Sequence, residues 1–179
     1  MLKKLPKTDA ILAVFAVISA MTYGWTLLAF LWKLPSWLHY LTPGEILSVY
    51  SYSLLTDFSE STLYLALLLL LCVLLPARLL SEAFVRRGTA LALCALGGMM
   101  ANLGFYINNE AGLIGPLPAW LVIAVCAITL MVLLDTLSRK YPLFAFALIG
   151  LADRLTIFLY LNLPLTAIAL VVVAIRNLS

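Results

Sequence analysis

Four side chains suited to acid–base chemistry fall in one polar stretch of an otherwise apolar sequence. Residues 33–61 contain His39, Glu45, Asp57 and Glu60, and an imidazole near a carboxylate can act as general base and acid. Glu45 and Glu60 also stand three residues after a Thr and an Asp, the spacing of a helix-capping box. This pattern supports binding or capping more than catalysis, so we assign no catalytic residue.

Polar residues inside the apolar runs form a second set of binding candidates. Asp153 and Arg154 are adjacent, and charged groups at membrane depth are costly and often functional. The pair is either an interfacial ion pair with Arg154 near lipid phosphate, or a clamp for a lipid headgroup or substrate. Asn102 and Asn162 are either binding residues or bridges between helices, each stabilising by about 0.6 kcal/mol.

Signals for metal, cofactor and disulfide chemistry are missing. The sequence has one histidine and no metalloprotease, phosphate-loop, dinucleotide or zinc pattern. Cys72, Cys94 and Cys126 all lie in apolar runs, where we interpret them as small packing residues. We therefore expect no metal, cofactor or disulfide.

The composition indicates that membrane-spanning helices position the candidate residues. Of 179 residues, 65% are hydrophobic and 11% are charged, whereas soluble domains have about 45–50% and 25%. This excludes a soluble globular domain, a disordered chain and a nucleic-acid-binding protein. We predict an all-α, polytopic transmembrane helix bundle, a single integral membrane domain over residues 1–179 whose first partner is the lipid bilayer.

Runs of about 20 apolar residues predict about five spans. The basic start resembles a signal peptide, but the apolar run after it is too long for one, so the first span is expected to be uncleaved. The spans are expected at residues 9–32, 61–80, 88–107, 119–137 and 155–175. In the third span, Ala90, Cys94, Gly98 and Asn102 recur every four residues, which predicts close packing against another helix.

Two further helical segments are expected not to span. Residues 43–58 begin at a Thr42–Glu45 capping box and form an amphipathic helix that lies on the outer face or caps the bundle. Its apolar face consists of Ile46, Tyr50, Leu54 and Phe58. Residues 143–151 are expected to form an interfacial segment before the last span, kinked near Pro164. The alternative for 143–175 is a membrane-dipping hairpin that returns Arg176 to the inside.

The charges predict an orientation through the positive-inside rule. One side collects eight basic residues, namely Lys3, Lys4, Lys7, Arg78, Arg86, Arg87, Arg139 and Lys140. The other side carries Lys33, Glu45, Asp57, Glu60 and Glu110. We therefore expect a cytoplasmic N-terminus, a bacterial plasma (inner) membrane location and, with five spans, a C-terminus outside. Asp135 is expected to pair with Arg139, four residues later on the same helix face.

Two segments resemble a known membrane module. Residues 41–47, continuing to 57–61, and residues 153–157, continuing to 163–165, are similar to the five-span module before the extracellular domain of bacterial sulfatase-fold proteins such as lipoteichoic acid synthases. The resemblance implies an N-terminus inside and a chain that leaves the membrane outward. Because the sequence ends at Ser179, where the catalytic domain would follow, we expect a stand-alone module without the family's metal ligands or nucleophile.

These patterns favour a membrane anchor, scaffold or regulatory accessory subunit for an envelope process, with a membrane protein partner or a second copy of the chain. The alternatives are a small-molecule or lipid transporter using Asp153, Arg154 and Asn162, and an intramembrane lipid-modifying enzyme using His39 with Glu45 or Asp57.

Overall fold

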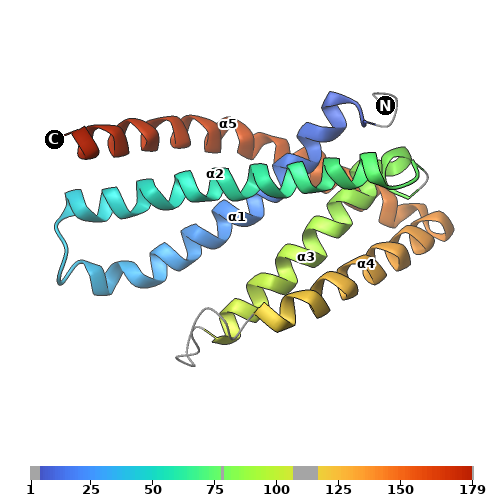
Figure 1. The fold of residues 1–179 in the computed structure, drawn as a ribbon, viewed down its shortest axis with the longest axis horizontal. Helices are drawn as coiled ribbons and strands as arrows, with labels where there is room; N and C mark the ends of the chain where they lie inside the picture. Colours follow the sequence, from blue (N-terminus) through green and yellow to red (C-terminus); the bar gives the residue numbers. More distant parts are fainter. Residues whose placement is uncertain (1–4, 78, 107–116, 179) are drawn as a thin grey trace.

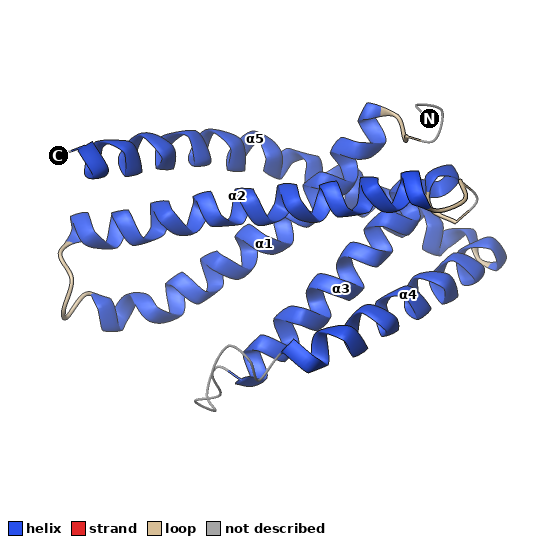
Figure 2. Cartoon of the chain, in the orientation of Figure 1, coloured by secondary structure: helices blue, strands red, loops and turns tan. Residues whose placement is uncertain are grey.

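The computed structural model describes residues 5–77, 79–106 and 117–178. Within these ranges the chain is helical and has no strand (Figure 2). The elements are α1 (Thr8–Trp37), α2 (Pro43–Leu74), the short 3-10 helix η2 (Ser81–Ala83), α3 (Phe84–Tyr106), α4 (Leu117–Lys140) and α5 (Pro142–Leu178). All five α-helices are long and apolar enough to cross a membrane. The predicted all-α bundle is confirmed, and it is compatible with a multi-pass membrane protein.

Helix α1 is the centre of the bundle. It packs against α2, α3 and α5, while α3 and α4 form an antiparallel hairpin beside it. Figure 1 shows α1, α2 and α5 running together, with the α3–α4 hairpin diverging from them. The start of α1, the α2–α3 connection and the α4–α5 turn meet at one end, which we call the N-terminal end. The α1–α2 turn and the end of α5 lie at the C-terminal end.

Small and branched side chains allow α1 to approach its neighbours closely. Val14, Val17 and Ile18 are fully buried and form the main apolar core with residues of α2, α3 and α5. A Cβ on Gly88 of α3 would stand 3.2 Å from a methyl group of Val14. Because lipid tails are as apolar as these side chains, such van der Waals contact replaces the hydrophobic force that packs soluble proteins.

Nearer the C-terminal end, hydroxyl groups join α1 to its neighbours. Thr22 Oγ1 lies 2.8 Å from Ser61 Oγ of α2, and Tyr23 Oη lies 2.6 Å from Thr166 Oγ1 of α5. All four residues are buried. A buried hydroxyl needs such a partner because no water is present to supply one, so these pairs fix the rotation of α1 relative to both helices.

The expected separate helix over residues 43–58 is instead the first half of α2. The Thr42–Glu45 capping box is confirmed, since the Glu45 N–H donates to Thr42 Oγ1 at 3.4 Å and the Thr42 N–H donates to Glu45 Oε2 at 2.8 Å. The capping-box interpretation of Asp57 and Glu60 was wrong, because both residues lie in the middle of α2 and no helix begins there. Hydroxyls here donate to carbonyls four residues back, for example Ser53 to Val49 and Thr56 to Tyr52, so these polar side chains are satisfied within the helix.

The apolar face of this segment packs inside the bundle. Ile46 and Leu54 are buried, and the Tyr50 ring lies 4.5 Å from that of Phe30 on α1. Phe58, expected on the same face, is exposed. Because the segment is continuous with the rest of α2 and packs on α1, it is not the separate outer-face helix that the sequence predicts.

The expected division of residues 143–175 is also wrong. Residues 142–178 form one helix, α5, with Pro164 inside it, so 143–151 is not a separate segment and no hairpin forms. Asp153 and Arg154 do not interrupt the helix because both side chains are exposed, while Ala152 beside them is fully buried. In the same way α1 continues through Pro35 to Trp37 and does not end near Lys33 as expected.

Gly98, one residue of the small-residue stripe of α3, lies at the contact between α3 and α4. A Cβ on Gly98 would stand 2.7 Å from Ile123 Cγ2 of α4, closer than such atoms can approach. The absence of a side chain at Gly98 therefore sets the spacing of α3 and α4. The stripe's predicted role in close packing is confirmed at this position.

Replacing Gly98 should open the hairpin. We expect Gly98→Ala to destabilise the protein by about 1–3 kcal/mol, the usual cost of overpacking, and to lower the thermal midpoint in detergent. Gly150→Ala is the matched control, because nothing lies within 4 Å of a Cβ there. Ile123→Ala should restore stability in the Gly98→Ala background. Equal midpoints for the two glycine variants would contradict this account of the α3–α4 contact.

Candidate functional site

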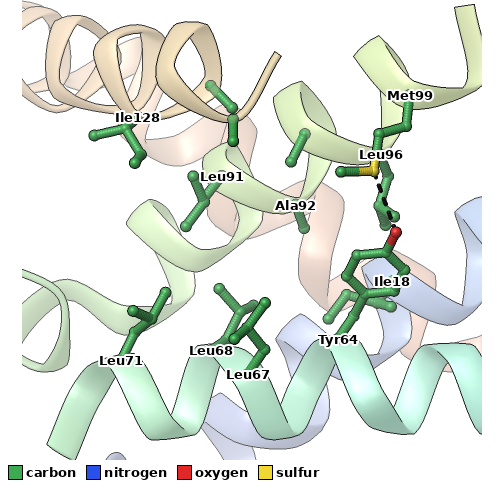
Figure 3. Close-up of a pocket in the computed structure, with 13 residues that line it drawn as sticks. Ile18, Tyr64, Leu67, Leu68, Leu71, Leu91, Ala92, Leu96, Met99 and Ile128 are labelled. Carbon is green, nitrogen blue, oxygen red and sulfur yellow. Dashed lines mark hydrogen bonds between the residues drawn. The ribbon is translucent and has the colours of Figure 1, made fainter. Parts of the chain in front are cut away.

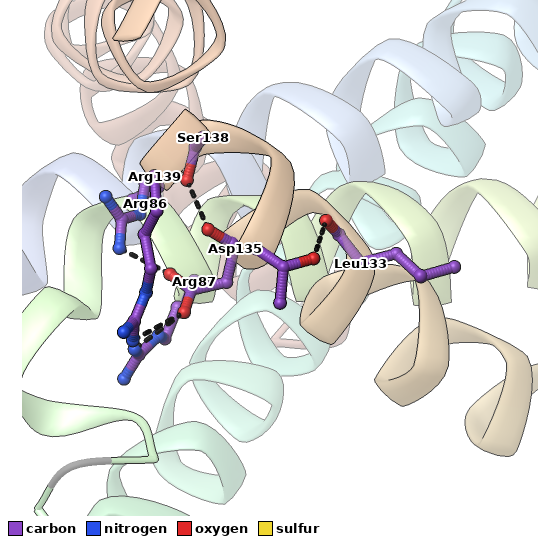
Figure 4. A network of polar contacts seen from close by, with 7 residues as sticks. Arg86, Arg87, Leu133, Asp135, Ser138 and Arg139 are labelled. Atoms are coloured by element: carbon purple, nitrogen blue, oxygen red, sulfur yellow. Dashed lines mark hydrogen bonds and ion pairs between the residues drawn. The ribbon is translucent and has the colours of Figure 1, made fainter. Parts of the chain in front are cut away.

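A cluster of three arginines around one aspartate lies at the N-terminal end of the bundle (Figure 4). Arg87 Nη2 donates to Asp135 Oδ2 at 2.7 Å, Arg139 Nη2 donates to the same oxygen at 3.1 Å, and Arg86 Nη2 donates to Oδ1. Asp135 and Arg87 are buried, whereas the Arg139 side chain is 66% exposed. We call these four residues the arginine cluster. The cluster has three formal positive charges and one negative charge. Of the three arginines, Arg139 is the one whose side chain is mostly exposed at the surface.

The hairpin assembles this cluster from two helix ends. Arg86 and Arg87 lie in the first turn of α3, and Asp135 and Arg139 lie near the end of α4. Antiparallel packing brings these ends together. The predicted pairing of Asp135 with Arg139 is confirmed. The pairing of Arg86 and Arg87 with Asp135 was not predicted, because 48 or more residues separate them in the sequence. One signal could have indicated it: the two arginines begin one expected span and Asp135 lies near the end of the next, and consecutive spans often pack antiparallel.

A second polar site, the acidic groove, lies between α1, α2 and α3 towards the C-terminal end. Its volume is about 530 Å³. It is lined by Trp25, Thr26, Val49, Tyr52, Ser53, Thr56, Asp57, Glu60 and Leu103. Two of these residues are carboxylates, and none is Lys or Arg.

Asp57 is the buried member of this groove. Thr26 Oγ1 donates to Asp57 Oδ1 at 2.7 Å, and the other oxygen, Oδ2, is buried without a hydrogen-bond partner in the described part of the chain. Glu60 lies one turn along α2 and is exposed. The groove therefore offers one buried and one open carboxylate, together with the hydroxyl groups of α2.

The structure brings together only two of the four candidates predicted from residues 33–61. Asp57 and Glu60 share the acidic groove. His39 is exposed in the α1–α2 turn, and Glu45 is exposed at the start of α2 with its carboxylate in the capping box. Asp57 lies about 21 Å along α2 from its first residue, at 1.5 Å per residue. His39 is therefore not placed to exchange protons with Asp57.

The other four candidates are dispersed. Asp153 and Arg154 are exposed on α5, and Asp153 lines a surface depression with Lys7 and Asp9 at the N-terminal end. Asn162 is buried about two turns further along α5, and its Nδ2 has no hydrogen-bond partner among the described residues. Asn102 is half-buried on α3, a different helix. The structure does not assemble these residues into one site.

The cysteines and possible metal ligands form no cluster in the described ranges. Cys72, Cys94 and Cys126 are unpaired, and no group of three or more His, Cys, Asp or Glu is suited to hold a metal ion. Cys72 is buried as its packing role requires, but Cys126 is exposed on α4, so it is not a packing residue within this chain.

No known protein family, curated protein or solved structure matches this chain. The resemblance to the membrane module of sulfatase-fold proteins therefore stays a prediction. The two polar sites, the arginine cluster and the acidic groove, carry the functional argument.

Neutralising Asp135 should destabilise the hairpin, because the buried Arg87 would lose its ion pair with that carboxylate. We expect Asp135→Asn to lower the free energy of unfolding by about 3 kcal/mol, typical of removing one partner from a buried pair. The thermal midpoint in detergent measures this. Asp153→Asn removes an exposed carboxylate at the same end and should leave the midpoint unchanged. Matching midpoints for Asp135→Asn and the wild type would refute the structural role of the cluster.

Proposed function

We propose that this protein is a membrane anchor and accessory subunit in a bacterial inner membrane, and that its acidic groove holds a transmembrane helix of a partner protein. The single observation that carries the proposal is the groove itself. It is an opening with two carboxylates in the side of a bundle whose surface is otherwise largely apolar.

The position of the groove makes its charges unfavourable without a partner. Glu60 lies about 21 Å from the last residue of α2, within a hydrocarbon layer about 30 Å thick if α2 spans it. Ionisable residues at such depth pair with a partner or line a pathway. The groove's own lining contains no basic residue, so a basic side chain on another protein would supply the missing charge.

The shape of the groove suits a helix. Its lining on α2 runs from Val49 to Glu60, about 16 Å or three helical turns. The hydroxyls of Ser53 and Thr56 already bond to the α2 backbone, so they present small, satisfied surfaces that a neighbouring helix can contact closely. We infer a partner helix with Lys or Arg in the half that lies towards the C-terminal end of this bundle.

The distribution of basic residues supports a cytoplasmic N-terminal end. Lys7, Arg86, Arg87, Arg139 and Lys140 lie at that end, whereas Lys33 and Arg176 lie at the other. Lys3, Lys4, Arg78 and Glu110, also used in the prediction, lie outside the described residues. With five spans, the acidic groove and the end of α5 then lie towards the outer side.

A photocrosslinking amino acid in place of Thr56 should capture the partner in growing cells. We expect an adduct with an integral membrane protein, and we expect Glu60→Lys to abolish it through charge repulsion while Glu60→Gln weakens it. Phe58 is the matched control position because it lies at the same depth of α2, is exposed and does not line the groove. Adducts with lipid alone, or with a second copy of this chain alone, would contradict the accessory-subunit proposal.

Topology reporters should place the end of α5 outside the cytoplasm. A fusion after Ser179 is expected to be active with a reporter that works outside the membrane and inactive with one that works inside, and a fusion in the α4–α5 turn should show the reverse. Activity inside for both fusions would overturn the proposed orientation. That result would leave the groove and its partner helix to be tested separately by the crosslinks.

A further inference from the structure

A narrow apolar groove lies on the side of the bundle where α2 faces the α3–α4 hairpin (Figure 3). Its volume is about 170 Å³, and apart from the Tyr64 hydroxyl its lining side chains are apolar. The lining residues come from α1 (Ile18), α2 (Tyr64, Leu67, Leu68, Leu71), α3 (Leu91, Ala92, Ala95, Leu96, Met99) and α4 (Ala124, Ala127, Ile128). The Tyr64 hydroxyl donates to Met99 Sδ at 3.2 Å and closes the end nearer the acidic groove.

The arginine cluster stands in line with the other end of this groove. On α3, Arg87 lies one turn before Leu91, on nearly the same helix face. On α4, Asp135 lies seven residues after Ile128 and Arg139 four residues after Asp135, again along one face. The apolar lining therefore gives way to the cluster within about 6–10 Å along either helix.

The arginine cluster carries more positive than negative formal charge and can therefore bind an anion. Three guanidinium groups surround one carboxylate, and both carboxylate oxygens are already engaged. Arg139 is mostly exposed, and the buried Arg86 Nε has no hydrogen-bond partner in the described ranges. Guanidinium groups bind phosphate through charge-assisted hydrogen bonds, and Arg139 lies one residue before the end of α4, where lipid phosphates are expected.

We propose that the apolar groove and the arginine cluster together bind one anionic phospholipid in the leaflet at the N-terminal end of the bundle. One acyl chain lies in the groove against Leu67, Leu91 and Ala124, and the phosphate contacts Arg139. The combination of a positive headgroup site with an aliphatic slot selects an amphiphilic anion over a free phosphate or a neutral lipid. This site is separate from the acidic groove and does not depend on its partner.

Native mass spectrometry of the purified full-length protein in detergent tests the proposal. Dioleoyl phosphatidylglycerol and dioleoyl phosphatidylcholine are added in graded amounts, and we expect one phosphatidylglycerol to bind at concentrations where phosphatidylcholine does not. Arg139→Gln should raise the Kd for phosphatidylglycerol about fivefold, which corresponds to the roughly 1 kcal/mol that one cation contributes near an anionic headgroup. Lys140→Gln removes an adjacent charge that lies over the Tyr141 ring, and it should change the Kd little.

Filling the groove tests the acyl chain separately. Ala95→Leu on α3 and Ala124→Leu on α4 narrow the groove from two different helices, and each should weaken binding of phosphatidylglycerol while the thermal midpoint without lipid stays unchanged. Two fillers keep the test informative if one of them fails to fold. The proposal is overturned if the two lipids bind equally, if Lys140→Gln acts like Arg139→Gln, or if inorganic phosphate displaces the lipid and neither filler has an effect.

Discussion

The bundle depends on the contacts that α1 makes with three other helices in surroundings that do not drive helices together. In lipid, association comes from close packing and from polar pairs, and α1 uses both. Near its start, Val14 contacts α3 at the Gly88 position, and Ile18 is fully buried in the same apolar core. Further along, Thr22 and Tyr23 bond to α2 and α5. Because each kind of contact occupies its own stretch of α1, the apolar core and the polar pairs lie at different depths of the bundle.

The α3–α4 hairpin is fastened at two separated places by different forces. Gly98 allows close contact with Ile123, which is a matter of shape. About 16 Å away along α3, Arg87 and Asp135 join the helices by charge. The ionic fastening stands near the end of both helices, where charged side chains can reach water and headgroups, and the steric one stands in the apolar interior. The charged contact is therefore placed where burying charge is least unfavourable, and the close steric contact is placed in the apolar interior.

Local sequence signals predicted three contacts correctly, although the equally local Asp57–Glu60 spacing did not mark a helix start. The Thr42–Glu45 cap, the Asp135–Arg139 pair and the close contact at Gly98 each depend on residues a few positions apart or on one side-chain volume. Helix lengths were not predictable in this way. An apolar run about as long as the bilayer is thick suggested where each span should end. Helices α2 and α5 continue past that length: several of their hydroxyls bond to their own backbone, Glu60, Asp153 and Arg154 are exposed, and the buried Asp57 accepts a hydrogen bond from Thr26. Arg86 and Arg87 reach Asp135 only through the packing of two helices, which no spacing in the sequence reveals.

The unequal lengths of the helices have a geometric consequence. Helix α2 has 32 residues and α5 has 37, about 48 and 55 Å at 1.5 Å per residue, against a hydrocarbon thickness of about 30 Å. Their far ends are joined side by side, since the Tyr52 hydroxyl donates to Asn177 Oδ1 at 2.9 Å. If the pair stands upright in the bilayer, it forms a short rigid stalk. Such a stalk would hold the 38–42 turn at a fixed height above the headgroups. The spacer would then consist of continuous helix and not of a flexible linker.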